Sequence, residues 1–144
     1  SAEGAEIGVW SNGTDKIIGN SYGIAGCRID LGETYFRSSW EANFARILNF
    51  IKVDWEYEPK RFELHNCSYC PDFFIKKYNC YIEITGRFAS KKVEKLRQFS
   101  ELYPDIRLYV MDGYGYKMLK EKFNNQVVNW EDSASRKEVM SKCV

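Results

Sequence analysis

The sequence predicts one α/β domain in which helices pack on a mixed β-sheet. One reason is size: 144 residues with 44% hydrophobic content, including 4 Trp, 10 Tyr and 9 Phe, suffice for one well-packed core but not for two. The other reason is element order, because a helical pattern precedes three strand-like runs, a second helix and a further strand. A strand–helix–strand crossover makes the last strand parallel to an earlier one, so the sheet is mixed.

The chain divides into three parts. Residues 1–36 are rich in Gly, Ser and Asn, which predicts an N-terminal extension or arm with short strands at 16–18 and 23–25. Residues 37–125 carry the regular patterns and are expected to form the core. Residues 126–144 are expected to be a polar C-terminal tail, helical from residue 133 onward.

The first helix is predicted to begin at an N-cap, Ser38 or Ser39, and to run to Ile51. Its apolar residues recur at helical spacing: Trp40, Phe44, Ile47, Leu48 and Ile51. This pattern predicts one buried face along the whole helix.

Three strand-like runs follow the first helix. They cover residues 54–64, interrupted at Glu58-Pro59, then 69–75, then 80–84. Polar turns at 65–68 and 76–79 separate them, which predicts a meander.

The second helix is predicted to start at a cap on Ser90 and to stop before Pro104. Its expected buried side consists of Val93, Leu96, Phe99 and Tyr103. A further strand alternates through Ile106, Leu108 and Val110. A turn at Asp112-Gly113 then leads to a short third helix over 114–123.

Charge and cysteine content narrow the class of protein. A net charge of +1 does not by itself indicate a nucleic-acid partner, so the distribution of charge matters more than the sum. Five cysteines, an odd number, without a secretory signal favour an intracellular, cytoplasmic and reduced protein. The apolar stretches are far shorter than a membrane span, and no membrane association is expected.

Three carboxylates have the spacing of a metal site. Glu41 lies on the first helix, while Asp72 and Glu83 lie at the ends of adjacent strand-like runs. Mg²⁺ and Mn²⁺ prefer oxygen ligands and combine few carboxylates with water and substrate phosphate. These positions predict a metal-dependent, DNA-cutting core.

Four sequence blocks strengthen this prediction. They are Phe36-Arg37-Ser38-Ser39-Trp40-Glu41, Trp55-Glu56-Tyr57-Glu58-Pro59, Cys70-Pro71-Asp72-Phe73 and Tyr81-Ile82-Glu83-Ile84-Thr85-Gly86. In this order, over residues 37 to about 112, the chain resembles the PD-(D/E)XK nuclease superfamily, and within it phage and mobile-element endonucleases. Transposase endonuclease subunits and phage junction resolvases share this layout. The resemblance implies a restriction-endonuclease-like core with the element order αβββαβ.

The resemblance also implies roles. Asp72 and Glu83 would be metal ligands together with the Ile84 carbonyl, and Glu41 would bind a second metal or orient the water. The bound Mg²⁺ or Mn²⁺ would polarise the phosphoryl oxygen and activate water for hydrolysis of a DNA phosphodiester. The expected partners are DNA, a second copy of the chain that supplies a second active site, and a recombination or transposition subunit. The expected setting is a bacterial or phage-infected cell.

Each carboxylate also has a structural interpretation. Glu41 fits a capping box begun by Ser38, Asp72 after Pro71 fits a turn, and Glu83 could face solvent. Glu83 lies between two isoleucines, so a half-buried carboxylate there would need a partner. From these residues alone both interpretations stay open.

Thr85 departs from the Glu-x-Lys pattern of the superfamily, whose lysine positions the water or steadies the phosphate. A basic residue from elsewhere could replace the lysine, and the candidates are Arg87, Lys91, Lys92, Lys76 and Lys77. Alternatively the metal suffices and the Thr85 hydroxyl holds the water. In a third interpretation the domain is a catalytically attenuated nuclease that only binds DNA, and an introduced Lys→Thr change is a further explanation.

Basic residues near these blocks form a candidate DNA contact: Arg37, Arg87, Lys91, Lys92 and Lys95. The competing interpretation is an ordinary solvated helix face, because Glu94 and Glu101 lie among them.

A second metal hypothesis is a zinc-stabilised interaction domain. Its ligands would be His65, Cys67, Cys70 and Cys80, with Cys27 as a further thiolate.

Overall fold

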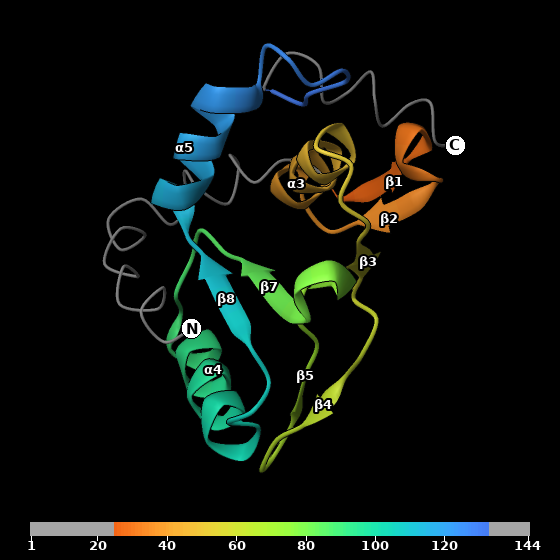
Figure 1. Ribbon diagram of the computed structural model, residues 1–144. Coiled ribbons are helices and arrows are strands. Elements are labelled where there is room, and N and C mark those ends of the chain that lie inside the picture. Colours follow the sequence, from red (N-terminus) through yellow and green to blue (C-terminus); the bar gives the residue numbers. More distant parts are fainter. Residues whose placement is uncertain (1–24, 133–144) are drawn as a thin grey trace.

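The computed structural model describes residues 25–132. Its elements follow one another along the chain (Figure 1). They are β1 (Gly26–Arg28), η2 (Ile29–Leu31), β2 (Thr34–Phe36), α3 (Ser39–Phe50), β3 (Glu56–Tyr57), β4 (Phe62–Glu63), β5 (Ser68–Tyr69), β6 (Phe73–Ile75), η3 (Lys76–Tyr78), β7 (Cys80–Ile84), α4 (Ser90–Leu102), β8 (Leu108–Met111) and α5 (Gly113–Phe123).

A four-stranded mixed sheet with the order β3-β6-β7-β8 forms the centre. β3, β6 and β7 are antiparallel neighbours, whereas β8 is parallel to β7 after the crossover through α4. The prediction of a mixed sheet with one parallel pair is therefore confirmed, and the fold is α/β. Two short hairpins, β1–β2 and β4–β5, stand beside this sheet.

Helix α3 forms where the apolar periodicity predicted it. Ser38 is its N-cap, and the Ser38 hydroxyl accepts a hydrogen bond from the Glu41 amide at 3.2 Å. Trp40, Phe44 and Leu48 are buried on its inner face, which confirms the predicted side. Ile51, however, is exposed and lies just beyond the end of the helix.

Three predicted elements differ in detail. The run over 69–75 is broken into β5 and β6, because Pro71 lacks the N–H that a continuous strand needs. Ser90 is the first residue of α4 rather than its cap, and Val93 is exposed, although Leu96 and Phe99 are buried as predicted.

The predicted turn at Asp112-Gly113 is instead the start of α5. Asp112 is the N-cap, and its Oδ1 accepts a hydrogen bond from the Gly115 amide at 2.9 Å. Packing at Gly115 is also tight, since a Cβ there would come within 3.1 Å of the Met111 Cγ.

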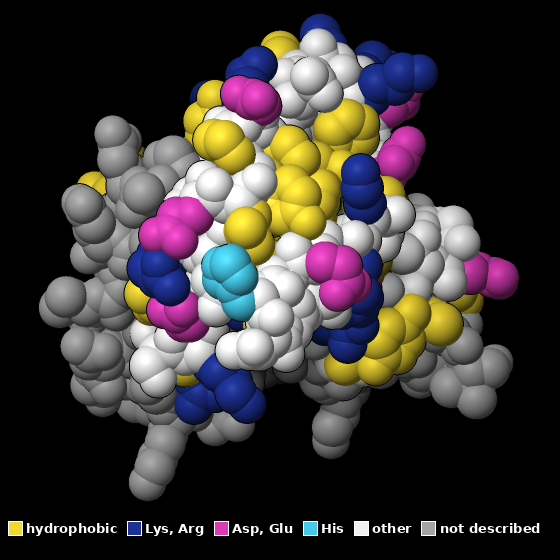
Figure 2. Space-filling model, turned by 90° about the horizontal axis from the view of Figure 1, so that it is seen from below, with side chains coloured by type: hydrophobic (Ala, Val, Ile, Leu, Met, Phe, Trp, Pro, Cys, Tyr) yellow, Lys and Arg dark blue, Asp and Glu magenta, His cyan; other side chains and the backbone are white. Residues whose placement is uncertain are grey.

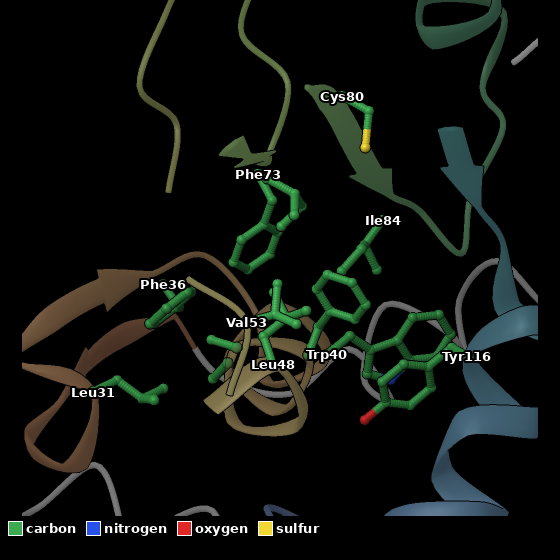
Figure 3. Packing of buried hydrophobic residues seen from close by; sticks show 13 residues of the cluster. Leu31, Phe36, Trp40, Leu48, Val53, Phe73, Cys80, Ile84 and Tyr116 are labelled. Atoms are coloured by element: carbon green, nitrogen blue, oxygen red, sulfur yellow. The ribbon is translucent and has the colours of Figure 1, made fainter. Parts of the chain in front are cut away.

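Two hydrophobic clusters cover opposite faces of the central sheet. The first joins α3 and α5 to the face that presents Phe73 and Ile84, and Figure 3 shows these side chains pointing toward the α3 residues. The second joins α4 and the β4–β5 hairpin to the face that presents Tyr81 and Leu108. Burying a side chain of this size contributes about 1.5–3 kcal/mol, so α3 and α4 are both firmly anchored to the strands.

The N-terminal extension contributes to the core from residue 26 on. The β1–β2 hairpin packs against α3, with Phe36 and Arg28 fully buried. Arg28 binds Glu131, which lies 103 residues further along the chain, with Nε–Oε2 at 2.6 Å and Nη2–Oε1 at 2.9 Å. The core thus extends beyond both ends of the predicted segment 37–125.

Some predictions fall outside the described residues, namely the short strand at 16–18, the first two residues of the strand at 23–25 and the helical tail from residue 133. Residue 25 itself is not in a strand, and β1 begins at Gly26. Between residues 25 and 132 no helix combines the length and apolar character that crossing a membrane requires.

Candidate active site

A pocket of about 530 Å³ opens between α3, β7 and the N-terminal end of α4. Glu41, Asp72 and Glu83 all line it, and they are called the carboxylate trio below. Their exposed fractions are only 8%, 6% and 2%. The structure thus brings together the three acids that the sequence singled out, on three different elements.

Asp72 is placed by the break between β5 and β6. Its carbonyl accepts a hydrogen bond from the Glu58 amide at 2.7 Å, and its Oδ2 accepts one from the Ile84 amide at 2.8 Å. These bonds tie Asp72 to both neighbouring strands. Asp72 thus lies in a bend just before β6, with its backbone bonded toward β3 and its side chain directed to β7.

Glu83 is placed by the alternation of β7. Its Oε1 accepts a hydrogen bond from the Tyr69 hydroxyl at 2.7 Å, and its Oε2 forms an ion pair with Lys92. Glu83 is therefore a buried carboxylate with partners and does not face solvent.

Glu41 satisfies one half of the capping box. Ser38 caps its amide, but the Glu41 carboxylate does not return to the Ser38 amide. Instead its Oε1 accepts hydrogen bonds from the Tyr57 hydroxyl and from the Arg37 amide, the latter at 3.3 Å. This arrangement turns the carboxylate into the pocket.

The electrostatics of the trio are those of like charges buried together. Burial, followed by the charges of Glu83 and Glu41, raises the pKa of Asp72 well above its usual value. Burial raises the pKa of Glu41 to about 7, against the opposing hydrogen bond from Tyr57. Three carboxylates so placed would be stabilised by positive charge in the pocket.

Cationic side chains surround the pocket. The pocket is lined by all five predicted DNA-binding residues, namely Arg37, Arg87, Lys91, Lys92 and Lys95. Arg61 is a sixth cation that lines it. On the face shown in Figure 2, by contrast, basic and acidic side chains are interspersed around an apolar centre. Six cationic side chains thus line this one pocket, although the net charge of the chain is only +1.

Thr85 lines the pocket, but its hydroxyl is engaged in a local turn. Thr85 Oγ1 donates to the Arg87 carbonyl at 2.7 Å and accepts from the Arg87 amide at 3.2 Å. Its proton and one lone pair are thus engaged locally, which leaves only one lone pair to accept a hydrogen bond from a water.

Lys92 is the basic residue that reaches the carboxylates. Among the ion pairs of residues 25–132, it is the one lysine or arginine paired with a member of the trio. Burial lowers its pKa, but the charge and hydrogen bond of Glu83 outweigh burial, so the pKa of Lys92 is raised. Lys76 and Lys77, the other candidates for a displaced lysine, lie in η3 and do not line the pocket.

The sequence did not single out three further residues of the site. Tyr57 and Tyr69 each donate to one carboxylate of the trio, and Glu58 pairs with Arg37 at 2.6 Å. Glu58 has a left-handed backbone with φ of 48°, an uncommon conformation that holds it at the pocket. Tyr57 and Glu58 belong to the second sequence block and could have been suspected, whereas Tyr69 is placed by tertiary packing alone.

The trio has the right chemistry for a hard cation, but its members are spread. Within the described part of the chain, no three His, Cys, Asp or Glu side chains are grouped closely enough to form a ready-made metal site. Asp72, Glu83 and the Ile84 backbone nevertheless lie at one pocket, and Mg²⁺ needs only one or two carboxylates beside water and phosphate. The residues therefore fit Mg²⁺ or Mn²⁺ better than a cation that requires a full protein cage.

The zinc hypothesis is not supported for the described residues, where no such cluster exists. Cys80 is buried in the first hydrophobic cluster, whereas His65 and Cys67 are exposed at the end of the β4–β5 hairpin. These residues are close in sequence but not in space, because Cys80 in β7 faces the first hydrophobic cluster, away from the β4–β5 hairpin.

Comparisons with known proteins do not assign this chain to a family. The chain matches no protein-family model, and neither a curated protein nor a solved structure matches it significantly. Functional conclusions therefore depend on the pocket itself.

Proposed function

We propose that this protein is a metal-dependent DNA endonuclease with a restriction-endonuclease-like core of the PD-(D/E)XK type. The observation that carries the proposal is the convergence of Glu41, Asp72 and Glu83 in one pocket surrounded by lysine and arginine. Buried carboxylates suit a divalent cation, and the surrounding positive charges suit a polyanionic backbone. Processing of phage or mobile-element DNA is the biological role that this site would serve.

The carboxylates and the neighbouring backbone would hold the metal. Asp72, Glu83 and the Ile84 carbonyl are the ligands, with Glu41 on the opposite wall for a second ion or for water. A bound Mg²⁺ or Mn²⁺ supplies a Lewis acid that polarises the phosphoryl oxygen and lowers the pKa of water. The tyrosines limit the freedom of the carboxylates, since Tyr57 and Tyr69 fix one oxygen of Glu41 and of Glu83.

Lys92 takes the role of the Glu-x-Lys lysine, whose position is occupied by Thr85 in this chain. It comes from α4 instead of β7, yet its ammonium reaches Glu83 and carries the charge that threonine cannot provide. Near the scissile phosphate, an ammonium would stabilise charge that develops in the transition state. This assignment is the displaced-lysine explanation of the departure at residue 85.

The remaining cations would bind DNA phosphates on either side of the pocket. Arg87, Lys91 and Lys95 lie on or next to α4, and Arg37 lies across the pocket beside α3. Such contacts position the backbone and make affinity depend on salt, without reading sequence. A second copy of the chain would be needed to cut both strands in one event.

The test is cleavage of a supercoiled plasmid and of a four-way junction with Mg²⁺ or Mn²⁺. The wild type is compared with Asp72→Asn and with Asp105→Asn, whose carboxylate is exposed and outside the pocket. We expect metal-dependent cutting that is lost in Asp72→Asn and kept in Asp105→Asn. Equal cutting by all three proteins would contradict the proposal.

A second candidate is a nuclease-fold module that binds DNA without cutting it. The observation in its favour is Thr85, which has no charge and whose hydroxyl is engaged with Arg87. DNA binding by both the wild type and Asp72→Asn, with no cutting under any metal condition, would favour this candidate.

A further inference from the structure

The ion pair between Lys92 and Glu83 has a consequence for metal binding. Both oxygens of Glu83 are engaged, one by the Tyr69 hydroxyl and the other by the Lys92 ammonium. A cation that ligates Glu83 through Oε2 would therefore meet the Lys92 ammonium at the same oxygen.

The position of Lys92 is that of a counter-ion for the whole trio. Its charge is stabilised by Glu83 first and by Asp72 and Glu41 as well. A divalent cation would be attracted to the same place by the same three charges. Two positive groups at the same Glu83 oxygen would repel each other strongly.

The Lys92 side chain is able to leave. The side chain of Lys92 is 31% exposed, whereas the side chain of Glu83 is 3% exposed, so the ammonium reaches the pocket from its open side. Its four-carbon stem is flexible, and Lys91 and Lys95 mark the adjoining surface where phosphates would lie.

We propose that Lys92 is the resident counter-ion of the carboxylate trio, and that a divalent cation binds by displacing its ammonium toward the DNA phosphate. This inference rests on the proposed nuclease function and adds a regulatory step to it. When the cation binds, Glu83 becomes a metal ligand and the Lys92 ammonium is released from it. The same competition keeps metal affinity low until phosphate arrives to receive the ammonium.

The experiment measures Mn²⁺ binding to the full chain, without DNA, by isothermal titration calorimetry. Lys92→Met keeps the apolar stem and removes the charge, so we expect binding at least about tenfold tighter than wild type. Lys91→Met removes a nearby charge that is not paired with the trio, and we expect its Mn²⁺ affinity to stay within about twofold of wild type. Cleavage by Lys92→Met should fall despite the tighter binding.

A second measurement on the wild type does not depend on the folding of any variant. Amine acylation followed by mass spectrometry should modify Lys92 several-fold faster with Mg²⁺ than without it, because the ammonium has left Glu83. Lys120, exposed on α5 and away from the pocket, serves as the internal control and should not change.

The outcomes separate the two proposals. Unchanged or weaker Mn²⁺ binding in Lys92→Met, or acylation of Lys92 that ignores Mg²⁺, overturns the displacement step. If Asp72→Asn still abolishes both Mn²⁺ binding and cleavage in that case, the nuclease proposal stands. No Mn²⁺ binding by either wild type or Lys92→Met overturns the displacement step. The nuclease proposal then falls only if metal-dependent cleavage is absent as well.

Discussion

Two groups of buried charges are built on the same helix, α3, and they differ in balance. One is the Glu131 network, to which α3 contributes Ser39, Asn43 and Arg46. The other is the carboxylate trio, to which α3 contributes Glu41. Comparing them separates charge that holds the fold together from charge that is kept for a ligand.

The Glu131 network is matched. Glu131 accepts hydrogen bonds from both Arg28 and Arg46, and Arg46 also pairs with Asp30 at 2.7 Å. Two guanidinium groups thus face two carboxylates, and Asn43 bridges the Glu131 backbone through both its amide nitrogen and its oxygen. With every charge paired, this network fixes the β1–β2 hairpin and the chain near residue 131 on α3.

The carboxylate trio is unmatched. Three acids face one ammonium, that of Lys92. The remaining partners are neutral donors, namely the hydroxyls of Tyr57 and Tyr69 and the backbone amides of Arg37 and Ile84. Neutral donors orient carboxylates but do not cancel their charge. The difference teaches that an excess of carboxylates over cationic partners, rather than burial of charge as such, distinguishes the proposed active site.

The largest effect is expected when the unmatched group loses a charge. Asp72→Asn should reduce DNA cleavage about a thousandfold or more, because it removes a metal ligand and its charge. The same change should leave the free energy of unfolding unchanged or raise it by about 1 kcal/mol, since it relieves repulsion within the trio. Single-turnover cleavage and urea denaturation measure the two effects, and a large loss of stability would break the comparison.

In the Glu131 network, by contrast, removal of a charge should lower the free energy of unfolding. Glu131→Gln keeps the size of the side chain but removes the carboxylate shared by Arg28 and Arg46, and we expect a loss of about 3 kcal/mol in the free energy of unfolding. Urea denaturation followed by far-UV circular dichroism measures it. A variant as stable as the wild type would show that the Glu131 network is not what holds these segments on α3.

A smaller effect is expected for the tyrosines that orient the trio. Tyr69→Phe removes the hydroxyl that donates to Glu83, and we expect kcat to fall about tenfold with KM little changed, consistent with about 1.5 kcal/mol for a hydrogen bond to a charged group. Tyr103→Phe is the control, because its hydroxyl donates to the Glu63 carbonyl away from the pocket. A rise in KM alone would mean that Tyr69 serves DNA binding instead.

The smallest effect is expected for single cations around the pocket. Lys95→Ala should weaken DNA binding modestly and lower the slope of log affinity against log salt by about 1. Arg97→Ala is a control on the same helix, because Arg97 pairs with Glu94 and Glu101 and does not line the pocket. Fluorescence anisotropy over a series of salt concentrations would show both slopes, and equal slopes would refute the DNA contact assigned to Lys95.

Local pattern was enough to predict much of this molecule. The spacing of Trp40, Phe44 and Leu48 predicted α3, and the alternation around Glu83 predicted β7. Whether the Glu83 carboxylate is buried or faces solvent was left open by the sequence and was decided by the structure. Such patterns are legible because side chains repeat every 3.6 residues in a helix and every two in a strand. The sequence also pointed to the three acids that line the pocket, although their chemical roles remain predictions.

Tertiary structure alone decided how those acids are supported. Nothing local links Tyr69 to Glu83, because their contact depends on the β4–β5 hairpin folding onto the sheet. The choice of Lys92 over its basic neighbours depends on how α4 is rotated against β7. Arg28 and Glu131 are 103 residues apart, and their pairing arises only when α3 brings both ends of the core together. Periodicity specifies which face of an element is buried, but the partner of a buried charge is specified only by which elements pack against one another.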